Sequence, residues 1–330
     1  MTESKSAIDW KTFIRRIKGG KCTPIISYLV TSPHFSDTEA VVKAWADEVK
    51  YPLADRHNLV RVAQYASLIG RDALAAKEGY LDFLKQRLLA RAREDQPPDQ
   101  SAFLDTLEDE LLDLNFSEVA GRLGYPHYEN ELDNPLRVLA ELPLPIYLTT
   151  NFTTYMEDAL KAAGKEPRSE ICYWQDELAG DVPSVFEENP DYEPSVEQPL
   201  VYHLHGLDAH PSSLVLTEDD YLDFLVKVSQ DPEAIPTRVA QALADSSLLL
   251  LGYQLQGWDF KVVFRGLITT KRSSRRLLSL AIQLTPDSEG ATSLVDAQEY
   301  LKRYFDHANF EIYWGDAQNF VQELWAQWEG

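Results

Sequence analysis

One histidine and one asparagine, each at the end of an apolar run, are the side chains of this sequence most suited to chemistry. His205 ends the run Leu200–His205 and precedes Gly206, which permits a turn and the close approach of a ligand. An imidazole in such a place can act as a general base near neutral pH. Asn151 follows the run Pro145–Thr150. Its amide either caps the helix that follows or is oriented toward a ligand at the helix N-terminus.

A second histidine lies two residues before the first. His203 and His205 alternate along an expected strand, which predicts that their side chains share a face. A metal ion bound with the help of His210 is one interpretation. A zinc site needs three or four ligands, and no carboxylate or thiol spacing completes one. We therefore predict no metal and place His203 in the core.

Four apolar runs end in small or polar residues, and these ends define a candidate ligand site. In a doubly wound sheet, ligands bind beyond the carboxyl ends of the strands. The residues at these ends are Ser27 and Tyr28, Thr150 and Asn151, His205 and Gly206, and Gly252 and Tyr253.

The elements that must position these residues alternate between apolar runs and helical patterns. Such alternation predicts an α/β fold with a doubly wound, Rossmann-like parallel sheet. The uninterrupted apolar run 246–253 indicates a central strand that is buried on both faces. Thr217 and Asp220 have the spacing of a capping box that starts a helix at Glu218. The other expected strands are 22–27, 145–150, 200–205, 277–284 and 310–314. The other expected helices are 10–17, 153–163, 258–268, one near 293–304 and one from residue 317.

A long helical segment interrupts this alternation. The pattern is almost entirely helical from 37 to 140, with helices expected at 37–49, 56–70, 73–94 and 101–113. We predict three segments: 1–36 with the first strand of the core, a helical insert 37–140 packed on that core, and 141–330 with the rest. The acidic, proline-containing stretch 180–199 is expected to be a solvated connection or a lid.

Composition excludes several classes of protein. The 330 residues include 31 Lys and Arg against 53 Asp and Glu, a net charge of −22, which repels a phosphate backbone and argues against direct nucleic-acid binding. The two cysteines, Cys22 and Cys172, form neither a disulfide framework nor a four-cysteine zinc site. No apolar run is long enough to span a bilayer and no secretory signal is evident, so we expect a cytoplasmic protein without membrane contact.

The order and spacing of several motifs resemble those of the bacterial SIR2-like (sirtuin-fold) family. The motifs are TTNFTTYMEDAL, then VYHLHG with SLVLTEDDYLDFL, then LLLLGYQLQGWDF, and the resemblance extends from KCTPIIS to the YWGDAQNFVQELW tail. Members of this family occur alone or as effector domains in anti-phage defence. The resemblance implies a sirtuin-type core with a large helical insert, and NAD⁺ as the substrate.

The resemblance also implies roles for individual residues. Asn151 and His205 would line the nicotinamide-ribose pocket, and Gly252 and Asp259 would lie on the adenosine side. The implied activity is hydrolysis of NAD⁺ to nicotinamide and ADP-ribose, with His205 as the base and Asn151 positioning the water. Such an effector would stay latent in an abortive defence response until a trigger or partner protein, or formation of a homo-oligomer, activates it.

The sequence departs from the family pattern at three places. The first strand ends in Ser27-Tyr28 instead of a glycine-rich turn, and side chains there crowd the approach of the NAD phosphates. Thr153 stands where the family often has an aspartate. The paired CxxC zinc module of the deacetylases is missing, which argues against deacylation. The alternative to a hydrolase is therefore a catalytically impaired SIR2-like subunit that binds a nucleotide or serves as a scaffold.

Overall fold

A parallel β-sheet forms the centre of the molecule. The computed structural model describes residues 8–27, 30, 38–95, 101–126, 134–253, 258–268, 279–283, 296, 299–300, 302–303 and 310–329. In this part of the chain, seven strands pair in parallel in the order β3-β4-β2-β1-β5-β6-β7. The strands are β1 (Cys22–Ile26), β2 (Ile146–Thr149), β3 (Arg168–Ile171), β4 (Leu200–His203), β5 (Ser247–Leu251), β6 (Ser279–Gln283) and β7 (Phe310–Trp314). The predicted doubly wound α/β fold is confirmed.

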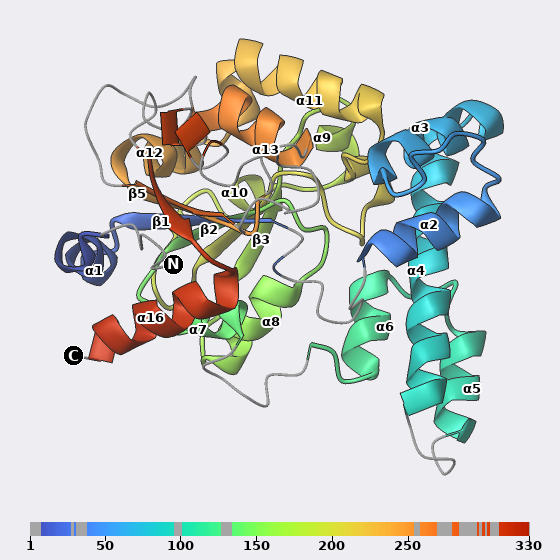
Figure 1. The fold of residues 1–330 in the computed structure, drawn as a ribbon, viewed down its shortest axis with the longest axis horizontal. Helices are drawn as coiled ribbons and strands as arrows, with labels where there is room; N and C mark the ends of the chain where they lie inside the picture. The colour runs from blue at the N-terminus through green and yellow to red at the C-terminus, as the bar shows by residue number, and fades with distance from the viewer. Residues whose placement is uncertain are drawn as a thin grey trace.

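Helices cover both faces of this sheet (Figure 1). One face carries α1 (Trp10–Lys18), α7 (Pro135–Glu141), α8 (Tyr155–Ala162) and α16 (Ala317–Glu329). The other carries α11 (Glu218–Gln230), α12 (Thr237–Asp245) and α13 (Trp258–Val262). The capping box expected at the start of α11 is present, because Thr217 accepts from the Asp220 N–H and the Asp220 carboxylate accepts from the Thr217 N–H.

Side-chain alternation along the central strands gives the molecule two apolar layers. Leu249 and Leu251 of β5 pack into the layer that contains α1 and α16, whereas Leu248 and Leu250 pack into the layer that contains α11 and α12. Successive side chains of a strand point to opposite faces, so a run of leucines fills both layers. Burial of each such side chain contributes roughly 1.5–3 kcal/mol.

The strand order places a topological switch point at the centre of the sheet. The chain leaves β1 and next joins the sheet at β2, on one side of β1. After β5 it next joins the sheet at β6, on the opposite side. This reversal creates a crevice beyond the carboxyl ends of β1 and β5. Ligands bind in such a crevice in open α/β sheets.

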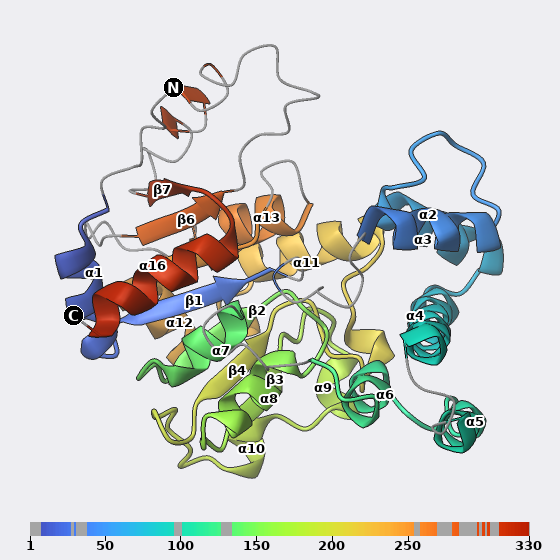
Figure 2. The same cartoon turned by 60° about the horizontal axis from the view of Figure 1, so that its bottom comes forward.

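The predicted helical segment lies beside the sheet, at the right of Figures 1 and 2. Its helices are α2 (Thr38–Glu48), α3 (Leu59–Gly70), α4 (Ala73–Asp95), α5 (Ser101–Asp109) and α6 (Phe116–Arg122). Apolar residues of α2, α4 and α6 join the same layer as α7 and α8, so the insert has no separate core. α7 packs under the sheet, where its Leu139 carbonyl accepts a hydrogen bond from Tyr147 of β2. The segment boundaries at 36 and 140 stay a prediction.

The acidic stretch 180–199 is more structured than a solvated connection. It begins within the short helix α9 (Leu178–Asp181) and contains α10 (Val185–Glu188). Val182, Val185 and Tyr192 are buried against the protein, because this stretch covers the edge strand β3. No helix among the described residues is both long and apolar enough to cross a bilayer.

Candidate functional site

The four predicted strand ends belong to four adjacent strands, β4, β2, β1 and β5. Backbone hydrogen bonds continue the pairing one residue beyond the strands. The Ser27 N–H donates to the Leu251 carbonyl at 2.9 Å, and the Thr150 N–H donates to the Ile26 carbonyl at 2.9 Å. The structure therefore brings Ser27, Thr150 and the residues that follow β5 to one edge of the sheet. Tyr28 and the side chain of Asp259 lie outside the described residues.

Asn151 forms a tight turn between β2 and α8. Its N–H donates to Thr149 Oγ1 at 2.9 Å, and its Oδ1 accepts from the Thr153 N–H at 3.2 Å. The side chain is 5% exposed. The sequence suggested this contact with the Thr153 N–H, but it closes a turn ahead of α8, whose N-cap residue is Thr154, and does not cap the helix. The contact fixes the orientation of the amide. A role for this amide toward a ligand stays a prediction.

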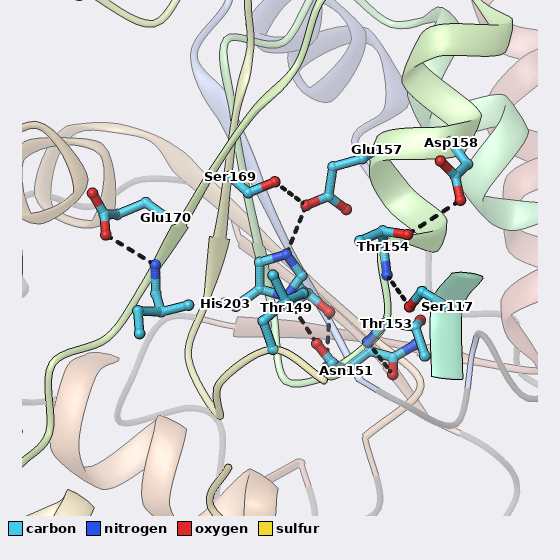
Figure 3. A network of polar contacts seen from close by, with 12 residues as sticks. Ser117, Thr149, Asn151, Thr153, Thr154, Glu157, Asp158, Ser169, Glu170 and His203 are labelled. Carbon is cyan, nitrogen blue, oxygen red and sulfur yellow. Dashed lines mark hydrogen bonds and ion pairs between the residues drawn. The ribbon is translucent and has the colours of Figure 1, made fainter. Parts of the chain in front are cut away.

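His203 lies between this turn and α8 (Figure 3). Its Nδ1 is 3.0 Å from the Asn151 carbonyl, and its Nε2 is 2.7 Å from Glu157 Oε1. Ser169 donates a further hydrogen bond to the same carboxylate oxygen at 2.7 Å. His203 is fully buried, so its placement in the core is confirmed.

The Glu157–His203 pair is held in its charged form. A carbonyl oxygen can only accept, so Nδ1 carries a proton, and the carboxylate favours a proton on Nε2 as well. Burial opposes the charged imidazolium, but the nearby Glu157 carboxylate outweighs it and raises the pKa of His203. The imidazolium in turn lowers the pKa of Glu157 against the effect of its own burial. His203 therefore anchors the Asn151 turn as a cation.

His205 occupies a different environment, on the opposite face. Its ring packs edge-to-face against Tyr221 and Phe224 of α11, with centroids 5.1 and 5.2 Å away. The prediction that His203 and His205 share a face is wrong, because β4 ends at His203 and the chain turns there. The two-residue alternation of a strand does not extend into a turn.

The imidazole of His205 is buried and uncharged. The residue is 4% exposed, and among the described residues its Nε2 has no hydrogen-bond partner. Burial lowers the pKa of His205 to about 3. Buried polar atoms normally have partners, so an unpaired imidazole nitrogen is a mark of a ligand-binding or catalytic position.

Glycines at two strand ends have positive φ angles and close neighbours. At Gly206 (φ +83°), a Cβ would lie 2.3 Å from the Ser213 carbonyl oxygen. At Gly252 (φ +78°), it would lie 2.3 Å from Val30 Cγ2. Only glycine fits these backbone positions without strain. Both glycines therefore shape the loops at the site, and contact with a ligand stays a prediction for each.

The remaining predicted residues are engaged within the protein. Tyr253 is buried and donates from its hydroxyl to Thr150 Oγ1 at 3.5 Å, which links the ends of β5 and β2. Ser27 is fully buried, and its carbonyl accepts from the Val30 N–H at 3.1 Å. Val30 thus folds back over Gly252 at the switch point. In this conformation the Ser27 side chain is closed to solvent.

Sequence reasoning missed a second group of polar atoms near this edge. Thr153 Oγ1, Glu157 Oε2 and Asp208 Oδ1 are buried and have no hydrogen-bond partner in the part of the chain that the structure describes. Burial raises the pKa of Asp208 to about 6, although Ser117 donates two hydrogen bonds to its other oxygen. The sequence feature that could have indicated this group is Asp208, an acidic residue three positions after His205. Within the described residues, no group of three His, Cys, Asp or Glu side chains could hold a metal ion.

Two comparisons relate this chain to known proteins. The SIR2-like domain family matches residues 145–313, which is half of the chain and includes β2, β4 and β5. The NAD(+) hydrolase ThsA of Enterococcus faecium is 34% identical over 93 residues. That alignment covers 28% of this chain and 16% of the length of the relative.

Proposed function

Because this chain belongs to the SIR2-like family, we propose that it is an NAD⁺ hydrolase that cleaves the bond between nicotinamide and ribose. The observation that carries the proposal is the unpaired, buried Nε2 of His205 at the end of β4. The Asn151 turn lies at the end of the adjacent strand, β2. The name of the relative ThsA, an NAD(+) hydrolase, supports the same reaction.

The chemistry assigned to the two residues follows from their environments. In this closed conformation burial lowers the pKa of His205 to about 3, so the imidazole is neutral but only weakly basic. Opening of the site to water would raise this pKa and let Nε2 accept a proton. It takes this proton from the attacking water or from a ribose hydroxyl. The Asn151 amide positions the water. The water oxygen bonds to C1 of the ribose as the bond to the nicotinamide nitrogen breaks, and the products are nicotinamide and ADP-ribose.

The burial of the candidate residues supports a latent enzyme. His205 and Asn151 are 4% and 5% exposed, so NAD⁺ reaches them only after the surrounding loops move. We propose that a trigger protein, a partner subunit or assembly with further copies of this chain opens the site in the cytoplasm. Depletion of NAD⁺ would then serve abortive anti-phage defence. Latency protects the host cell until that moment.

Nicotinamide release from NAD⁺ tests the proposal. We expect His205→Ala to reduce the rate about 10²–10⁴-fold, the usual contribution of general-base catalysis. Asn151→Ala should also reduce it, because the water is no longer oriented. His210→Ala is the matched control, since this partly buried histidine lies outside the proposed machinery and should leave the rate unchanged. Equal release from the wild type and both site variants excludes the mechanism.

A catalytically impaired, nucleotide-binding or scaffold subunit is the second candidate. It is favoured by the full burial of Ser27 and by the packing of Val30 against Gly252, which close the switch point. Thermal unfolding with NAD⁺ and with ADP-ribose separates the two candidates. A ligand that binds only the folded protein raises the melting temperature. An absent shift with both ligands, and also with candidate partners present, favours the scaffold.

A further inference from the structure

We propose that Ser117 of the helical insert is a positioning residue that holds the Asn151 turn against the loop that follows His205. This inference rests on the proposed function, in which Asn151 and His205 act on the same bond. It assigns the insert a part in building the site, through α6, beyond packing on the core.

Ser117 contacts both loops at once. Its Oγ donates to Asp208 Oδ2 at 2.7 Å, and its backbone N–H donates to the same oxygen at 2.6 Å. The same Oγ accepts a hydrogen bond from the Thr154 N–H at 3.1 Å. Asp208 is three residues after His205, and Thr154 is three residues after Asn151. One hydroxyl group therefore joins the two catalytic loops. Figure 3 shows its contact with Thr154.

Two further contacts join α6, the Asn151 turn and the loop that follows His205. The Asp208 N–H donates to the Phe152 carbonyl at 2.8 Å, which joins the His205 loop to the Asn151 turn directly. The Phe152 ring packs edge-to-face against Phe116 of α6, with centroids 6.1 Å apart. The segment Asn151–Thr154 is thus held from one side by the insert and from the other by Asp208.

The hydrogen bonds between Ser117 and Asp208 are strengthened because both residues are buried. Ser117 is 7% exposed and Asp208 is 2% exposed, so water does not compete for their hydrogen bonds. A charged acceptor also strengthens the bonds that Ser117 donates. Because Thr154 is the N-cap residue of α8 and makes no side-chain capping bond, the Ser117 hydroxyl supplies an external partner at the point where α8 begins.

Ser117→Ala tests the proposal with two independent measurements. The first is amide hydrogen exchange over residues 151–156, which we expect to become at least tenfold faster when the Thr154 N–H loses its acceptor. The second is steady-state NAD⁺ hydrolysis, in which we expect kcat to fall at least tenfold while KM changes less than threefold. Ser117→Thr keeps the hydroxyl and should restore both values toward those of the wild type.

Ser184→Ala is the matched control. Ser184 Oγ donates to Glu170 Oε2 at 2.6 Å, and the Val185 N–H donates to the same oxygen at 2.9 Å. The control therefore removes a hydroxyl from a similar carboxylate junction at β3, outside the proposed machinery. It should change neither the exchange of residues 151–156 nor kcat.

The outcomes separate this inference from the proposed function. Unchanged exchange in Ser117→Ala overturns the positioning role, as does faster exchange with an unchanged kcat. A wild-type protein that releases no nicotinamide even with candidate triggers and partners present refutes the hydrolase, and exchange alone then decides whether Ser117 holds the turn. Equal effects of Ser117→Ala and Ser184→Ala on kcat would indicate a general loss of stability and would also overturn the proposal.

Discussion

At the scale of single residues, two histidines only two positions apart in the sequence have pKa values shifted in opposite directions. His203 is charged because the Glu157 carboxylate outweighs its burial, and His205 is neutral because no such group faces it. The same residue type therefore serves as a structural cation at one position and as a candidate base at the other. Environment, not residue type, assigns the roles.

Asp208 provides a pH test at this scale. The unfolded chain loses its proton near 3.8, whereas burial keeps the carboxyl of the folded protein protonated up to a pKa of about 6. Asp208 therefore costs stability as the pH rises through this window, by about 3 kcal/mol at neutral pH. Asp208→Asn keeps an acceptor for Ser117 and removes the charge. We expect the variant to gain stability relative to the wild type between pH 4 and pH 7.

Urea unfolding of both proteins across this pH range measures the effect. A difference in unfolding free energy between variant and wild type that stays constant from pH 4 to pH 7 would contradict the raised pKa. Asp219→Asn is a suitable control, because Asp219 is exposed at the start of α11.

The sequence alone predicted some features of the candidate site from local patterns, but not the contacts between distant segments. It located His205, Asn151 and the strand ends, because apolar runs followed by polar residues and glycine are local patterns. It could not separate the faces of His203 and His205, because the end of β4 depends on pairing with β2. Nor could it find the Ser117–Asp208 contact, which joins positions 91 residues apart.

At the scale of elements, the Glu157–His203 pair joins α8 to β4 across a fully buried contact of 2.7 Å. Removing one member of a buried ion pair leaves the other without compensation, at a cost of about 3–5 kcal/mol. We expect Glu157→Gln to destabilise the protein by about 3 kcal/mol, since the neutral amide can still form one hydrogen bond. Urea unfolding measures this value, with exposed Glu188→Gln as the control.

A decrease of less than about 1 kcal/mol in the unfolding free energy of Glu157→Gln would mean that His203 is neutral in the folded protein. The variant should also lower the pKa of His203, which the C2-proton resonance of the imidazole reports in an NMR titration. The NMR titration therefore tests whether His203 is charged even if the change in unfolding free energy is small.

Element prediction from sequence succeeded where periodicity was strong and failed for short or polar elements. β1, β2, β4, β5 and the long helices follow from apolar runs and helical spacing. β3 has the sequence Arg-Ser-Glu-Ile, which contains no apolar run, and it forms a strand because β4 offers an edge for pairing. α6 was missed although Asn115 and Glu118 form a capping box, a signal that the sequence does contain.

At the scale of the whole molecule, the insert and the sheet share an apolar layer and a buried ion pair. Lys77 of α4 forms a buried ion pair with Asp220 of α11 at 3.1 Å, and its Nζ lies 5.1 Å from the centre of the Trp174 ring. Burial lowers the pKa of Lys77, and the Asp220 carboxylate opposes that change. The insert is therefore attached next to Tyr221, the residue that packs on His205.

We expect Lys77→Met to destabilise the protein by about 3–5 kcal/mol, because the Asp220 charge stays buried without its partner. Far-ultraviolet circular dichroism and tryptophan fluorescence should report one coincident transition, as for a single cooperative unit. Gln64→Ala is the control, since it removes an exposed insert-to-core hydrogen bond to Asp219. Two separated transitions in the wild type would show that the insert unfolds independently.

The position of β1 in the strand order decides which pieces of this chain can fold. The family match begins at residue 145, after β1, so a fragment with the matched limits 145–313 lacks that strand. Its other strands would divide into β3-β4-β2 and β5-β6-β7, with no backbone hydrogen bonds between the two sets. Each set would present an unpaired inner edge flanked by leucines, which favours aggregation. The limits of homology are therefore not the limits of an expressible domain, and the first strand has to be included.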